Sequence, residues 1–289
     1  MSAVETIQAV VRIFLDKPSP LWETGSTHQL VEAKYTALAK SSSIDRKNYS
    51  TAAVLDIEDA SLDKQFLATY DQYTIYLEKT DPKLADFCEA HGLVPLTGRE
   101  LIRTRAASKL KAALNILGLI PECAACIAEL VNCIQVVTAE GPEFDTSYSH
   151  PNLPFTIFVS VCEDDSLNGD LRVAESILHE AMHLKLTLIQ EYIELVKPDS
   201  MDTFFSPWRN VQRPLMGVLH GLFVFRAIRD LFQNIRDHTE LNNRDYNFAT
   251  YRMADIAGDF QALNNFCQCH GLTEIGRKLA DQLQSLDFD

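Results

Sequence analysis

The sequence lacks a surplus of positive charge. Its 289 residues include 26 Lys and Arg against 40 Asp and Glu, a net charge of −14. Because phosphate binding requires basic side chains, this balance argues against a nucleic-acid partner. It permits a basic peptide partner, although many acidic chains are simply well solvated.

Signals for membrane insertion and export are also missing. The most apolar long stretch, residues 112–131, contains Pro121 and Glu122, so it does not predict a membrane span. Residues 1–15 have no basic start and carry Glu5, which does not fit a signal peptide. We therefore expect a cytoplasmic protein with no membrane partner; its oligomeric state leaves no trace in the sequence.

The spacing of the cysteines does not match a zinc ribbon. The seven cysteines include a single CxxC, Cys123 to Cys126, with no second pair to complete a metal site. It stands in an apolar helical pattern with no strand before it, so we interpret both thiols as core residues. The remaining composition, 46% apolar and 23% charged, is typical of a globular protein.

Apolar residues recur at helical spacing along most of the chain, which predicts a mainly α fold. A capping box at Thr97 and Glu100 marks one helix start, and Pro214 marks another. The expected helices cover residues 3–16, 28–40, 62–77, 82–90, 98–117, 122–137, 171–196, 214–232, 247–270 and 274–286.

A loop-rich segment at residues 139–154 is the best candidate boundary. It separates a helical N-terminal region, 1–140, from a mostly helical catalytic region, 141–289, unless the two form one continuous domain. Phe155 to Val161 is rich in β-branched and aromatic residues and predicts a short β element before the helix at 171–196. Its edge could pair with an extended peptide, or it could be purely structural.

The helix expected at 171–196 contains the sequence His179-Glu180-Ala181-Met182-His183. Histidines four residues apart share a helix face, so both rings can reach one metal ion. The surrounding residues are apolar on nearly every side, which predicts a buried helix whose polar groups need partners. The motif also occurs by chance, but the combination favours a metal site.

A metal site on this motif needs a third protein ligand. Glu191 and Glu194 lie two and three turns along the same helix and are too far to fold back. Asp230 and Glu240 remain possible but have no motif around them.

His220 is the better candidate for the third ligand. It lies in a separate apolar helix between Gly217 and Gly221, where another backbone or a ligand could approach closely. Arg213 precedes it by seven residues, which would place both on one helix face. A metal ligand beside a guanidinium suits a keto acid with a distal carboxylate. Arg209 could serve instead, and a surface ion pair is an equally simple role for Arg213.

Three segments together resemble a known family. They are Glu175-Ser-Ile-Leu-His-Glu-Ala-Met-His-Leu184, Ser206-Pro-Trp-Arg209, and Arg213-Pro-Leu-Met-Gly-Val-Leu-His-Gly-Leu-Phe-Val-Phe225. This pattern is similar to the HExxH-type proteins encoded beside ribosomal peptide natural-product genes, which are 2-oxoglutarate-dependent peptide β-hydroxylases. The resemblance covers roughly residues 155–226 and is vague over the N-terminal helices.

The resemblance implies an Fe(II) dioxygenase that uses 2-oxoglutarate and O2 to hydroxylate a β-carbon in a precursor peptide. It implies that His179, His183 and His220 match the metal positions. Because this set departs from the two-histidine, one-carboxylate triad, the role of Glu180 stays open. Spacing alone does not distinguish iron from zinc, since imidazoles suit either metal.

Two other functions remain. A zinc-dependent metallopeptidase would use the same HExxH, with Glu180 as the general base. A binding module would hold a peptide and no metal. His220 and Arg213 have no obvious use in peptide hydrolysis, which favours the oxygenase.

Overall fold

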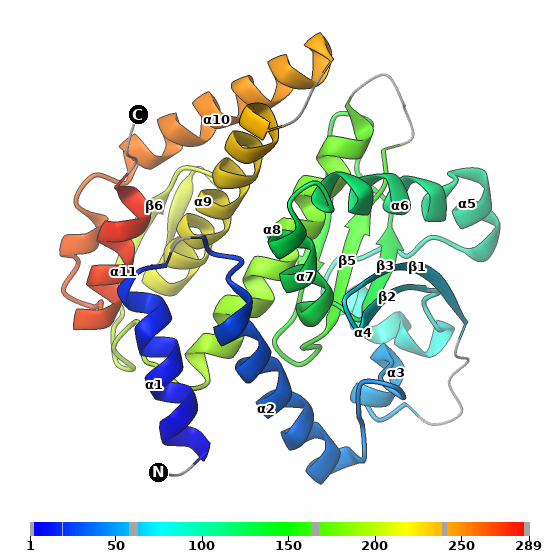
Figure 1. Ribbon diagram of the computed structural model, residues 1–289, viewed down its shortest axis with the longest axis horizontal. Coiled ribbons are helices and arrows are strands. Elements are labelled where there is room, and N and C mark those ends of the chain that lie inside the picture. Colours follow the sequence, from blue (N-terminus) through cyan, green and yellow to red (C-terminus); the bar gives the residue numbers. More distant parts are fainter. Residues whose placement is uncertain (1–2, 19, 58–62, 163–167, 239–241, 286–289) are drawn as a thin grey trace. The chain divides into compact units, whose positions relative to one another are not determined.

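The structure is a computed structural model in which residues 3–18, 20–57, 63–162, 168–238 and 242–285 are described (Figure 1). Its chain forms two compact units. The first, here called the sheet unit, is Thr27–Leu184. The second, the helical unit, combines Met1–Ser26 with Lys185–Asp289. The boundary near residue 140 that the sequence suggested lies inside the sheet unit.

The sheet unit is built on five strands in the order β1-β2-β3-β5-β4 (Figure 1). These strands are β1 (Lys64–Tyr70), β2 (Tyr73–Glu78), β3 (Cys133–Val137), β4 (Ser147–Ser149) and β5 (Thr156–Ser160). The pairs β2–β3 and β3–β5 are parallel, whereas β1–β2 and β4–β5 are antiparallel. Among the described residues, β1 and β4 are therefore the outer strands.

This sheet overturns the mainly α prediction. Helices make up 57% of the described residues and strands 14%, so the fold is mixed, with far more β structure than one short element. Residues 62–77, expected as a helix, contain the hairpin of β1 and β2 instead. Asp71 turns the hairpin in the left-handed region, with φ of 52°. The apolar spacing there fitted a helix by accident, because short aromatic and β-branched stretches satisfy both periods.

The helix expected at 122–137 is also wrong in its second half, which forms a strand. Helix α7 (Pro121–Leu130) ends at Val131, whose backbone is extended, and β3 follows. All five residues of β3 are buried, and a continuous apolar run does not distinguish a buried strand from a buried helix. The strand expected at 155–161 is confirmed as β5, where it occupies an inner position of the sheet.

The sheet unit also contains several helices. They are α2 (Thr24–Ser42, which begins in the helical unit), α3 (Thr51–Val54), η1 (Pro82–Leu84), α4 (Ala85–Ala90), α5 (Gly98–Arg103), α6 (Ala106–Leu117) and α7. The capping box at Thr97 and Glu100 is confirmed at the start of α5. Helices α6 and α7 pack on β1 and β2.

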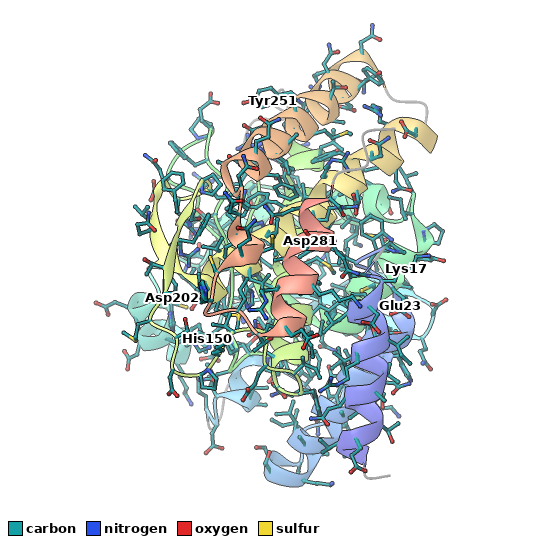
Figure 2. All side chains as sticks on the ribbon, turned by 90° about the vertical axis from the view of Figure 1, so that its left-hand side faces the viewer. Lys17, Glu23, His150, Asp202, Tyr251 and Asp281 are labelled. Atoms are coloured by element: carbon teal, nitrogen blue, oxygen red, sulfur yellow. The ribbon has the colours of Figure 1, made fainter. Side chains whose placement is uncertain are left out.

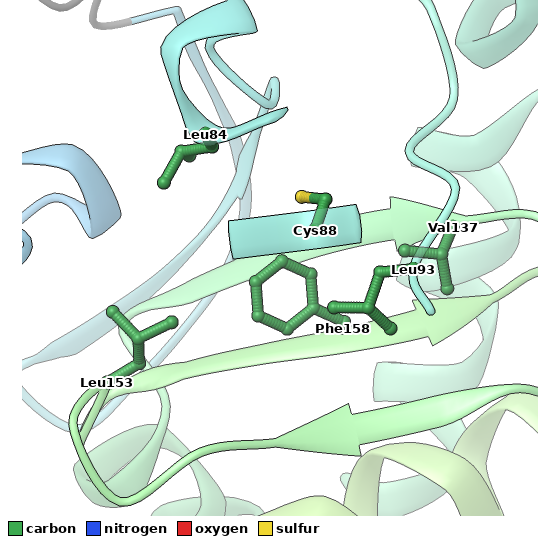
Figure 3. Packing of buried hydrophobic residues seen from close by; sticks show 6 residues of the cluster. All are labelled: Leu84, Cys88, Leu93, Val137, Leu153 and Phe158. Atoms are coloured by element: carbon green, nitrogen blue, oxygen red, sulfur yellow. The ribbon is translucent and has the colours of Figure 1, made fainter. Parts of the chain in front are cut away.

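A compact apolar cluster joins α4 to the sheet (Figure 3). The ring of Phe158 from β5 lies beneath Cys88 of α4, and Val137 of β3 lies near Leu93 (Figure 3). Leu84 and Leu153 complete the cluster, and all six residues are at most 6% exposed. Burial of these side chains fixes α4 on this face of the sheet.

The helical unit is organised around one long helix. It contains α1 (Ala3–Asp16), β6 (Thr203–Ser206), β7 (Val211–Pro214), α9 (Leu215–His238), α10 (Asn243–Ala262), η2 (Phe266–Gln268) and α11 (Glu274–Gln284). Helix α9 packs against α10, α11 and β6. Figure 2 labels Tyr251 on α10 and Asp281 on α11.

The CxxC pair and the apolar helices agree with the expectations from composition. Cys123 and Cys126 are fully buried on α7, which confirms their role in the core. Within the described part of the chain, no helix is both long and apolar enough to cross a membrane.

Candidate metal centre

Helix α8 (Gly169–Gln190) carries the HExxH sequence and is buried on most sides, as its composition predicts. Glu175, His179 and His183 recur every four residues and are partly exposed, whereas the residues between them are buried. Because four residues are slightly more than one helical turn, these side chains share a face. The accessible stripe of α8 therefore contains both histidines.

The two imidazole rings point their outer nitrogens at each other. The Nε2 atoms of His179 and His183 are 3.2 Å apart, with ring planes inclined at 65°. Two nitrogens bound about 2.1 Å from one metal at about 90–110° would be about 3.0–3.4 Å apart. The 3.2 Å contact is a hydrogen bond between the two rings, and the same separation is compatible with a shared metal ion.

The donor set around this pair can be judged for the part of the chain that the structure describes. Within the described ranges, no group of three or more His, Cys, Asp or Glu side chains gathers closely enough to hold a metal. The observed donor set is a two-imidazole pair with a nearby carboxylate.

That carboxylate, Glu180, is 3% exposed and firmly oriented. Its Oε2 accepts a hydrogen bond from Ser149 Oγ at 2.6 Å, and its Oε1 lies 3.8 Å from His179 Nε2. A carboxylate held in this way can accept a proton or position a bound water beside the imidazoles.

Ser149 belongs to the outer strand β4, within the segment 139–154 that the sequence predicts to be rich in loops. Its neighbour Tyr148 has the opposite orientation along the strand and shares a 2.8 Å hydrogen bond with His91 Nδ1. Burial, and then the charge of Glu180, raise the pKa of Tyr148. A three-residue strand has no local signature, because it exists only through its pairing with β5.

His220 lies on α9 in the helical unit and is partly buried. Its Nε2 is 2.8 Å from Gln190 Nε2 at the end of α8. With the amide nitrogen donating, the imidazole accepts through the lone pair that a metal would use. Burial, and then the charge of Arg213, lower the pKa of His220 to about 4. The ring is therefore neutral at physiological pH, as coordination requires.

The prediction that Arg213 shares a helix with His220 is wrong. Arg213 lies on β7, paired with Phe204 of β6, and α9 begins only at Leu215. Its guanidinium nevertheless packs along the first turn of α9, since a Cβ on Gly217 would be 3.2 Å from Arg213 Cζ. Arg209 lies in the exposed turn between β6 and β7.

The two glycines beside His220 serve neighbouring side chains. Gly217 admits Arg213, and Gly221 admits the ring of Trp208, which also stacks on Phe225 at 5.0 Å. The close approach expected from the sequence is thus made by the chain itself. Trp208 of the Ser206–Arg209 segment therefore needs a glycine at 221, and Arg213 needs one at 217.

The remaining carboxylate candidates have other surroundings. Helix α8 ends at Gln190, earlier than the expected residue 196, so Glu191 and Glu194 do not continue it. Asp230 is paired with Arg226 at 3.0 Å, and burial raises its pKa. Glu240 lies outside the described residues.

Comparisons with known proteins add no family assignment. No protein-family model matches the sequence, and no curated protein matches it either.

The pKa of His220 predicts how stability depends on pH. In the unfolded chain the ring takes up a proton below about pH 6.5, whereas in the fold it does so only near pH 4. The free energy of unfolding should therefore fall as the pH drops through this window, by about 1–2 kcal/mol from this group. Urea titrations of metal-free protein should show a shallower pH dependence in His220→Gln. The same substitution at the exposed His270 is the control, and equal slopes in the wild type and both variants would contradict this assignment.

Proposed function

We propose that the protein is an Fe(II)- and 2-oxoglutarate-dependent dioxygenase that β-hydroxylates a residue of a ribosomally made precursor peptide. The observation that carries the proposal is the 3.2 Å separation of His179 Nε2 and His183 Nε2 on the accessible stripe of α8. The resemblance of three sequence segments to peptide β-hydroxylases supplies the choice of iron and keto acid.

His220 is the proposed third metal ligand. Its support lies within the helical unit, where burial keeps the imidazole neutral and the side-chain amide of Gln190 occupies its Nε2 at 2.8 Å. Exchanging an amide hydrogen bond for a metal bond costs little. Three imidazoles would leave three coordination positions for a bidentate keto acid and O2.

Arg213 is the proposed partner of the distal carboxylate of 2-oxoglutarate. Its guanidinium is already in the electrostatic environment of His220, because its charge contributes to the lowered pKa of that ring. A planar guanidinium can bind a carboxylate through two parallel hydrogen bonds. Arg209 is the alternative, in an exposed turn.

When bound, iron would supply the oxygen chemistry, in which a C–H bond, 2-oxoglutarate and O2 give a hydroxyl group, succinate and CO2. The chain's own residues would bind the ion and orient the co-substrate. The imidazoles hold the ion, Arg213 aligns the co-substrate, and Glu180 with Ser149 places a hydrogen-bond acceptor beside the pair. The proposal includes a cytoplasmic location, which seven cysteines without disulfides support.

The test is product analysis. Metal-free protein is supplied with Fe(II), ascorbate, 2-oxoglutarate and O2, together with the precursor peptide encoded beside its gene. Succinate should form, and mass spectrometry should find peptide heavier by one oxygen atom. Cleaved peptide formed with zinc and without keto acid would overturn the proposal.

A zinc-dependent metallopeptidase is the second candidate. The position of Glu180, 3.8 Å from His179 and held by Ser149, favours it, because a general base in hydrolysis occupies this place. The same assay separates the two reactions, since only one of them consumes the keto acid.

Replacing Glu180 with glutamine tests the role of its charge. The amide keeps an oxygen for Ser149 but cannot take a proton, so we expect hydroxylation to slow about tenfold at unchanged metal content. Turnover of the peptide and metal analysis are the two measurements. A variant with full activity would remove Glu180 from the mechanism.

The two arginines can be distinguished by kinetics. Arg213→Gln should raise the KM for 2-oxoglutarate about 100-fold, since one side of a charged pair is lost. Arg209→Gln, in the exposed turn, should change it less than about threefold. The reverse order would assign the carboxylate to Arg209, and Arg213→Lys should restore only part of the affinity because lysine binds as a point charge.

A further inference from the structure

A crevice of about 500 Å³ lies in the sheet unit, built from elements that the proposed metal centre does not use. One wall is formed by Gln65 of β1 and by Leu77 and Lys79 at the end of β2. The other wall is formed by Ile102 of α5 and by Arg105, which precedes α6. These residues lie at the end of the sheet bounded by the outer strand β1.

The charge of this region is opposite to that of the whole protein. Between Glu89 and Glu122 the sequence has one acidic residue, Glu100, in a chain with 40 acids. The same stretch contains the basic residues Arg99, Arg103, Arg105, Lys109 and Lys111. The three arginines are exposed, and one of them, Arg105, lines the crevice. Lys79 lines it too, and its Nζ is 4.0 Å from the carboxylate of the exposed Asp63, the one acid among the described residues of the lining. A local positive patch on an acidic protein attracts an anionic partner.

The backbone of β1 adds a second means of recognition. Lys79 N donates to Asp63 O at 2.9 Å, so Asp63 and, by alternation, Gln65 direct their backbone groups at β2. The backbone groups of Lys64 and Phe66 then point away from β2, at the outer edge of the described sheet. An extended chain could add to β1 through these groups.

Apolar contacts are available at the same edge. Ile102 is 81% exposed and Phe66 is 53% exposed, with Lys111 Nζ 5.6 Å from the ring of Phe66. Exposed large apolar residues beside an open strand edge usually mark an interaction site. Side chains of an added strand alternate, so every second one would face the crevice, whose opposite walls carry Lys79 and Arg105.

We propose that this crevice and the edge of β1 bind an acidic, extended peptide segment by strand addition. Backbone hydrogen bonds to β1 supply affinity, and the exposed Arg99, Arg103 and Arg105 select for Glu and Asp. Nucleic acid is the less favoured partner, because a strand at the outer edge of the described sheet, with exposed Ile102 and Phe66 nearby, offers it no complementary contacts. The proposal requires no metal and stands independently of the proposed oxygenase activity.

The experiment measures fluorescence anisotropy of a labelled peptide of about ten alternating Glu and Val residues, long enough for one strand. The wild type should bind it and should bind the Lys and Val counterpart far more weakly. Charge reversal in Arg99→Glu/Arg103→Glu/Arg105→Glu should weaken binding about tenfold or more at low salt. The matched control is Arg12→Glu/Lys40→Glu/Lys47→Glu, which makes the same charge change at exposed positions elsewhere.

Backbone recognition is tested at Phe66. Phe66→Ala removes the ring only, whereas Phe66→Pro also removes the outward N–H and is tolerated on an edge strand. The proline variant should bind about fivefold more weakly than the alanine variant. Circular dichroism checks that both remain folded. No binding of the acidic peptide, equal binding by both triple variants, or tighter binding of a single-stranded oligonucleotide of equal length would overturn the proposal.

Discussion

Replacing His183 with alanine is expected to lower metal affinity about 100-fold or more and to abolish metal-dependent turnover. His179 Nε2 and His183 Nε2 are 3.2 Å apart, so in the proposed site each ring would supply one of two adjacent coordination positions. Without the ring of His183, a bound ion would keep a single ligand on α8. Metal content and the absorption spectrum of the Co(II) form are the measurements.

Two other histidine variants provide comparisons for this prediction. His220→Ala should weaken binding by a comparable factor if it is the third ligand. His270→Ala, at an exposed position, should bind metal as the wild type does. Metal should raise the melting temperature of the wild type and of His270→Ala only, because binding to the folded state stabilises it. A His183→Ala variant with full metal content would exclude the HExxH pair as the metal site.

Gly221→Ala should destabilise the helical unit by about 1–3 kcal/mol. A Cβ at this position would overlap the indole of Trp208, whose Cε3 would lie 2.5 Å away. The ring has little room to withdraw, since it stacks on Phe225 at 5.0 Å and meets Phe260 at 6.5 Å. The clash therefore outweighs the gain of about 0.5–1 kcal/mol that alanine normally brings to a helix interior.

Gly258→Ala is the matched control on α10. Nothing lies within 4 Å of a Cβ there, so the same substitution should stabilise by about 0.5–1 kcal/mol. Urea unfolding of both variants measures the difference. If both glycines respond alike, the contact between Trp208 and α9 does not limit this position. In Gly221→Ala, a second substitution of Trp208 by leucine should restore part of the stability.

Several parts of the fold followed from local sequence. The capping box at Thr97, the strand now seen as β5 and the burial of Cys123 and Cys126 were all predictable. Each depends on neighbours within a few residues or on a simple apolar pattern. The β1–β2 hairpin was not predictable in this way, because its pairing competes with an equally good helical pattern.

At the candidate site the same division applies. That His179 and His183 share a face is a consequence of helix geometry alone, and the sequence by itself determined it. Only the tertiary structure brought Ser149 to Glu180 across 31 positions of chain, and laid Arg213 of β7 against Gly217 of α9. It also made the sheet that replaced the expected mainly α fold. Helical neighbours are set by the backbone's own repeat, whereas these partners are chosen by strand pairing and packing between segments that no local pattern connects.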